Sequence, residues 1–221
     1  MNTDKIIKNT TEYVKQELKS AEGGHDWFHI ERVFKNALFI AKKENVNILV
    51  VSLAALLHDI ADSKFHKGNE DIGPRKANDF LSKQNILNED KEHIIQIIKN
   101  ISFKNSLDVG LQKFSSRELE VVQDADRLDA IGAIGIARCF NYGGFKNRAL
   151  YDPEVPPNLN MTKEEYKNTN APTINHFYEK LLLLKDKMNT DTGKKIAENR
   201  HEYMEVFLKQ FFSEWNGKIK L

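Results

Sequence analysis

Apolar residues along most of the chain recur every three to four positions, the spacing of helices with one buried face. This spacing predicts helices over residues 3–20, 27–44, 48–61, 74–84 and 89–101, a further helix that opens near 115, and two more over 173–188 and 191–215. No convincing strand alternation lies between them. The pattern therefore predicts an all-α fold, and we expect one helical domain over residues 1–221.

Polar residues at the predicted helix starts support several of these boundaries. Asp26, Asn47 and Asn88 are each placed to cap the helix that follows, and Ser115-Ser-Arg-Glu118 matches a capping box. Two glycines, Gly132 and Gly135, fall within a helical pattern that they would ordinarily weaken. Their spacing indicates close packing against a neighbouring element.

In segment 141–172 the apolar residues follow neither a helical nor a strand spacing. Turn formers such as Tyr151-Asp-Pro153 and Pro156-Pro157 interrupt it. A loop of this length in a compact domain is usually functional or mobile. We expect residues 141–161 to lie on the substrate side of an active site, with the mobile surface loop as the equal alternative.

The helix expected over 48–61 is apolar on nearly every side, which predicts that it is the central buried helix. It ends in His58 and Asp59. A buried helix that ends in these two residues needs compensation for its charge, and an imidazole beside a carboxylate is a mixed donor set that suits divalent first-row metals. The pair therefore indicates a metal site, provided that other segments supply further ligands.

Two other segments carry the residues that complete such a site. Upstream stands His25-Asp26-Trp-Phe-His29, and downstream stands Asp124-Ala-Asp126-Arg127-Leu-Asp129-Ala-Ile-Gly132. The ordered set resembles the HD superfamily of metal-dependent phosphohydrolases, most closely its bacterial nucleotide-hydrolysing members, from about residue 20 to 155. The resemblance implies an HD-domain helical bundle with one divalent ion, whether Mn, Ni, Mg, Co or Fe, on four ligands: His29, His58, Asp59 and Asp126.

Further roles follow from the resemblance and from the charged and aromatic residues near these segments. Relatives often carry an acidic residue just after the His-Asp pair, so Asp62 is expected to take or orient the proton of the attacking water, with a simple helix-end residue as the alternative. Binuclear relatives add histidines, but His66 and His93 stand in no recognisable ligand pattern, which favours one metal. The residues expected to contact substrate are Lys64, Arg127 and Arg138 at phosphate and Tyr151 at the base, with Lys146 and Arg148 as further phosphate candidates.

The activity that the resemblance implies is hydrolysis of nucleotides. Release of pyrophosphate from (deoxy)nucleoside triphosphates is the first choice, and a nucleoside 5′-monophosphate phosphatase is the enzyme alternative. The non-enzymatic alternative is a metal-containing module that senses nucleotides. Guanosine tetraphosphate hydrolases have His-Asn after the last Asp-Arg-Leu, whereas this chain has Asp129-Ala130 there. This difference argues against guanosine tetraphosphate as the substrate.

Composition narrows the remaining function classes. A net charge of +1 argues against a stable nucleic-acid complex, although a cleft can still be locally positive. One cysteine, Cys139, fits a reducing cytosol, and neither a signal peptide nor a membrane span is apparent, so we expect a cytoplasmic protein. The aromatic stripe Tyr203, Phe207, Phe211 and Trp215 is expected to form core or a homodimer contact.

Overall fold

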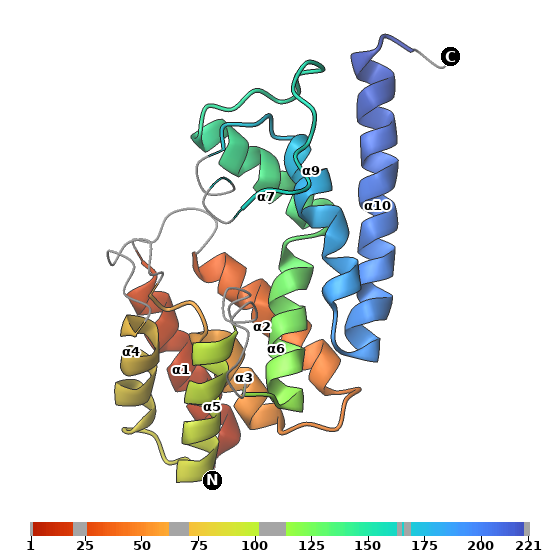
Figure 1. The fold of residues 1–221 in the computed structure, drawn as a ribbon. Coiled ribbons are helices and arrows are strands. Elements are labelled where there is room, and N and C mark those ends of the chain that lie inside the picture. Colours follow the sequence, from red (N-terminus) through yellow and green to blue (C-terminus); the bar gives the residue numbers. More distant parts are fainter. Residues whose placement is uncertain are drawn as a thin grey trace. The chain divides into compact units, whose positions relative to one another are not determined.

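The computed structural model describes residues 2–19, 26–61, 71–101, 114–162, 165 and 169–218 (Figure 1). These residues form helices and connecting segments without a strand, which confirms the all-α fold class. None of the helices in this part of the chain has the length and apolarity needed to cross a bilayer. The chain divides into two compact units, Met1–Asp126 and Arg127–Leu221, which are described separately below. The expected organisation as one domain stays a prediction.

The first unit is built around α3. It contains α1 (Thr3–Glu17), α2 (Trp27–Ala41), α3 (Ile48–Leu57), α4 (Ile72–Leu81), α5 (Asn88–Asn100) and α6 (Arg117–Asp129) up to Asp126. Every residue of α3 after Ile48 is buried, and α1, α2 and α5 all pack against it (Figure 1). The predicted central buried helix is therefore confirmed, and its polar end carries His58.

The predicted caps are partly confirmed. The side chain of Asp26 accepts a hydrogen bond from the His29 amide, and that of Asn47 accepts from the amides of the second and third residues after it. Asn88 does not cap, because it is the first helical residue of α5 and follows Leu87. At α6 the capping hydroxyl is that of Ser116, which accepts from the Leu119 amide at 3.1 Å.

The second unit pairs α7 (Gly132–Phe145) with the long helix α10 (Asp191–Trp215). Gly132 has φ +74°, and a Cβ built on it would lie 3.0 Å from both Cβ and Cγ of Arg200. This is the close packing expected from the glycine spacing, since a side chain at position 132 would be strained and would press on α10. A Cβ on Gly135 would overlap the carbonyl oxygen of Ala130 instead.

Two predicted boundaries in this unit are wrong. Residues 141–145 belong to α7, so the irregular segment begins only after Phe145. The helix expected over 173–188 is broken into α9 (Asn175–Glu179) and two 3₁₀ turns, η3 (Leu181–Leu183) and η4 (Lys185–Lys187). Four successive leucines, 181–184, cannot all share one helix face. The 3₁₀ turn buries Leu181 and leaves Leu183 exposed.

Candidate metal centre

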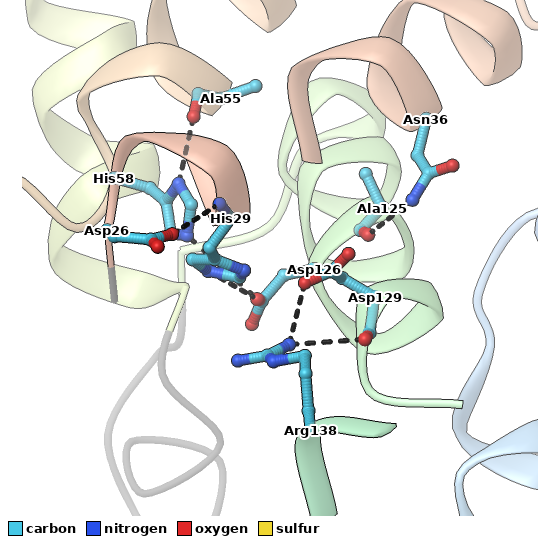
Figure 2. Close-up of polar contacts among 9 residues, drawn as sticks. All are labelled: Asp26, His29, Asn36, Ala55, His58, Ala125, Asp126, Asp129 and Arg138. Atoms are coloured by element: carbon cyan, nitrogen blue, oxygen red, sulfur yellow. Dashed lines mark hydrogen bonds and ion pairs between the residues drawn. The ribbon is translucent and has the colours of Figure 1, made fainter. Parts of the chain in front are cut away.

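Three side chains from three helices of the first unit converge on one point (Figure 2). His29 comes from the first turn of α2, His58 from the end of α3 and Asp126 from α6. Nε2 of His29 lies 3.5 Å from Oδ1 of Asp126, and Nε2 of His58 lies 3.9 Å from the same oxygen. One ligand atom from each residue falls within 4.8 Å of the others, so the three atoms could bind one ion.

Hydrogen bonds orient the imidazole of His58 and hold the backbone of His29. Nδ1 of His58 lies 2.8 Å from the carbonyl oxygen of Ala55. A carbonyl only accepts, so Nδ1 carries the hydrogen and Nε2 keeps the lone pair that a metal ligand needs. His29 is held by the cap at Asp26, whose Oδ1 accepts from its amide at 3.0 Å. Asn36, two turns further along α2, donates to the carbonyl of Ala125 at 3.4 Å.

The two histidines of the cluster are buried, whereas its aspartate is partly exposed to solvent. The side chains of His29 and His58 are 3% and 5% exposed, whereas that of Asp126 is 43% exposed. Solvent therefore reaches the cluster on the carboxylate side. Ligands bound at about 2.1 Å to one ion lie roughly 3–3.5 Å apart, close to the observed separations. The donors, two imidazole nitrogens and a carboxylate oxygen, fit a divalent first-row metal and leave coordination positions open.

The fourth expected ligand is not part of this cluster. Asp59 follows His58 directly, but among the described residues the convergent group contains only the two histidines and Asp126. Asp59 is not without a partner in the structure. Asp62 and Lys64, together with His25 and His66, lie outside the described residues. The roles expected for Asp59, Asp62 and Lys64 stay predictions.

His93 lies apart from the metal cluster. Its Nε2 is 2.9 Å from the hydroxyl of Ser116 and 3.7 Å from the carboxylate of Glu118, in the contact between α5 and the start of α6. It therefore belongs to a polar junction of the first unit, and it is a natural control for the histidines of the cluster.

The expected substrate contacts of the second unit all have partners there. Nη1 of Arg138 donates to the carbonyl and to Oδ2 of Asp129, at 3.1 and 2.7 Å (Figure 2). Arg127 donates to the carbonyl of Lys187. The ring of Tyr151 meets those of Phe211, Phe212 and Trp215 edge-on, with centroids 6.3, 5.2 and 5.1 Å away. Their roles at the substrate stay predictions.

Two residues whose side chains donate to backbone carbonyls of α6 were not predicted from the sequence. Arg200 reaches from α10 to the carbonyl of Leu128, in the last turn of α6. No local pattern pointed to it, because this contact joins positions 72 residues apart. Asn36 was within reach of prediction, since it lies seven residues after His29 on the same helix and so on the same face.

A family model described as the HD domain matches residues 27–131, a range that contains the three convergent residues. YpgQ of Bacillus subtilis, described as uncharacterized, is 37% identical over 205 residues, which cover 93% of this chain and 91% of YpgQ. The chain belongs to the HD superfamily.

Solved structures agree with this assignment over nearly the whole chain. An HD-superfamily hydrolase from Bacillus thuringiensis is 43% identical, with a TM-score of 0.78, and covers 97% of this chain and 99% of its own. YpgQ in complex with ADP is 36% identical, with a TM-score of 0.76 and 97% of each chain covered. The expected superfamily is thus confirmed, and its solved members include a protein described as a hydrolase.

Proposed function

We propose that this HD protein is a metal-dependent phosphohydrolase of nucleotides, and that it releases pyrophosphate from (deoxy)nucleoside triphosphates. The convergence of His29, His58 and Asp126 carries the proposal, because these donors suit a catalytic divalent ion. The nucleotide class is supported by the relative YpgQ, which has a crystal structure in complex with ADP.

The three convergent residues would hold the ion, with Asp59 as the proposed fourth ligand. A divalent ion bound there would make water more acidic and would stabilise charge on phosphoryl oxygens. The chain itself supplies rigidity: Ala55 selects the tautomer of His58, and the cap at Asp26 fixes the backbone of His29. Both histidines are buried, so neither ligand has room to swing away from the centre.

Water is the proposed nucleophile, and Asp62 is proposed to take or orient its proton. Cys139 is a poor alternative nucleophile, because burial raises the pKa of its thiol to about 12 and leaves almost no thiolate at neutral pH. Lys64, Arg127 and Arg138 are proposed to balance the substrate phosphates. The ¹⁸O of labelled water should then appear in the phosphate unit attacked, with no phospho-enzyme trapped.

Product analysis tests the activity. The purified protein should be incubated with Mn²⁺, Mg²⁺, Ni²⁺ or Co²⁺ and a panel of nucleoside mono-, di- and triphosphates, with products separated by anion-exchange chromatography. Pyrophosphate and a monophosphate from a triphosphate are expected. Phosphate from monophosphates alone would replace the proposal with a phosphatase, and binding without any product would replace it with a nucleotide sensor.

A matched pair of histidine variants tests the metal centre. His58→Ala should lose the ion, measured by elemental analysis of protein purified without chelator, and with it the activity. His93→Ala should keep both, because His93 lies in the α5–α6 junction and outside the cluster. Full metal occupancy in His58→Ala would refute the assigned centre.

A further inference from the structure

The end of α7 presents two aromatic rings to solvent. Tyr142 is 50% exposed and Phe145 is 68% exposed, and they stand one turn apart on the helix. Gly144 lies between them, and a Cβ built on it would meet nothing within 4 Å. The other side of this turn is closed, since Gly143 is buried against Thr173. The second unit therefore has, at this helix end, a surface with two partly solvent-exposed rings.

Two cations lie beside these rings because of how the helix ends. Asn147 has φ 53°, and the chain turns back so that the Arg148 amide donates to the Gly143 carbonyl at 2.9 Å. The turn brings Cζ of Arg148 to 5.6 Å from the Tyr142 ring centroid. Nζ of Lys146 lies 5.8 Å from the same centroid and 5.4 Å from that of Phe145.

The positive charge on this surface is not neutralised by an ion pair in the described part of the chain. Lys146 and Arg148 contact rings and a backbone carbonyl there, and the nearest carboxylates along the chain are those of Asp129 and Asp152. Arg148 donates through Nη2 to the Thr169 carbonyl, while its Nε is buried without a hydrogen-bond partner. The Thr169 carbonyl holds the guanidinium over the Tyr142 ring, where its positive charge would attract an approaching anion.

We infer that Tyr142, Phe145, Lys146 and Arg148, together the Tyr142 surface, bind a nucleotide, with the base against the rings and the phosphates against the two cations. The inference rests on the nucleotide substrate class proposed above. An apolar partner would bury the two cations without countercharge, and a simple polyanion would leave the rings uncovered. An aromatic base joined to phosphates meets both requirements.

The position of Tyr142 distinguishes it from the tyrosine that the sequence favoured. Tyr151 already has three rings of α10 around it, whereas half of the Tyr142 side chain is open to solvent.

The Tyr142 surface offers two rings and two cations at one helix end, which suits a single nucleotide better than an extended strand. The net charge of +1 likewise argues against binding of a long nucleic-acid strand.

Calorimetric titration of the full chain in the presence of Mn²⁺ tests the inference with two probes, ADP and inorganic pyrophosphate. Tyr142→Ala should raise the Kd for ADP roughly tenfold, in the range of a lost base–aromatic stack, and leave that for pyrophosphate unchanged. Lys146→Ala should raise both, by an amount that shrinks as salt is added. Tyr203→Ala is the matched control, a tyrosine 54% exposed on α10, and should change neither Kd.

An unchanged Kd for ADP in both Tyr142→Ala and Phe145→Ala would overturn the inference. Both side chains are exposed, so both variants should fold, and a wild-type circular dichroism melt checks this. A single-stranded oligonucleotide that binds far more tightly than ADP, and loses this affinity in Tyr142→Ala, would overturn the assignment to a mononucleotide.

The outcome for the Tyr142 surface is separable from that for the hydrolase. An active enzyme in which Tyr142→Ala keeps the wild-type Kd for ADP refutes the Tyr142 surface alone. A wild-type protein that releases no product from any nucleotide, but loses ADP affinity in Tyr142→Ala, refutes the hydrolase and keeps the surface.

Discussion

Substitution of two adjacent glycines in α7 should change stability in opposite directions. Gly143 faces the interior, and a Cβ added there would overlap Oγ1 of Thr173 and lie 3.0 and 3.1 Å from its Cγ2 and Cβ. Thr173 is only 3% exposed and donates from its hydroxyl to the Ala149 carbonyl at 3.1 Å, so it has little freedom to move aside. Gly144 faces open space, and a methyl group there meets nothing.

The expected magnitudes follow from these contacts. In both positions alanine favours the helix by about 0.5–1 kcal/mol, since glycine has more backbone freedom to lose. At Gly143 this gain is opposed by overpacking, which costs about 1–3 kcal/mol, and by the loss of the Thr173 hydrogen bond, about 1 kcal/mol. Gly143→Ala should therefore destabilise by about 1–3 kcal/mol net, while Gly144→Ala should stabilise by about 0.5–1 kcal/mol.

Thermal unfolding followed by circular dichroism measures both effects. In a chain of this size each kcal/mol shifts the Tm by roughly 2–4 °C, so the two variants should lie on opposite sides of the wild type. The difference between them isolates the contact with Thr173, because the helix preference is common to both. Equal Tm shifts for the two variants would refute the close approach of α7 to Thr173.

Three other predictions concern single side chains. Burial, with the charges of Lys180 and Arg148, lowers the pKa of His176 from 6.5 to about 4, so between these values only the unfolded chain binds the proton. Stability should therefore fall by up to about 3 kcal/mol as pH drops through this window, and urea unfolding of His176→Gln should lack this loss. Cys139, whose thiol pKa is raised to about 12 by burial, should react with a disulfide reagent at pH 8 only after denaturation; rapid labelling of the folded protein would contradict this. Asp62→Asn should keep the metal and lower kcat by roughly 10²–10⁴-fold, and a wild-type kcat would remove Asp62 from the chemistry.

Most of the helices could be predicted from the sequence because their apolar spacing is decided locally. The helix bounded by Thr190 and Trp215 is correct at both ends, since a capping threonine starts it and a polar segment ends it. The break after Glu179 was missed because four leucines fit a helical pattern as well as a 3₁₀ turn. What separates the two is which leucine finds a buried place, and that depends on tertiary packing.

The candidate site, like the helices, could be predicted only in part from the sequence. The order of His29, His58 and Asp126 along the chain was sufficient to predict that they meet, because family resemblance carries information on tertiary contacts. The sequence could not show that Tyr142 is exposed and Tyr151 packed, since both stand in a segment rich in turn formers. Burial of the Tyr151 ring depends on the end of α10, where Phe211 lies sixty residues further along the chain.

The complete burial of α3 has a consequence for how the site responds to thermal motion. Its amides can exchange with deuterium only when the packing of α1, α2 and α5 around it opens, so they should be among the slowest in the first unit. His58 follows directly on this helix. A ligand attached to the most protected backbone stays in place during the fraying of outer helices, so the geometry of the centre should persist until the unit itself unfolds.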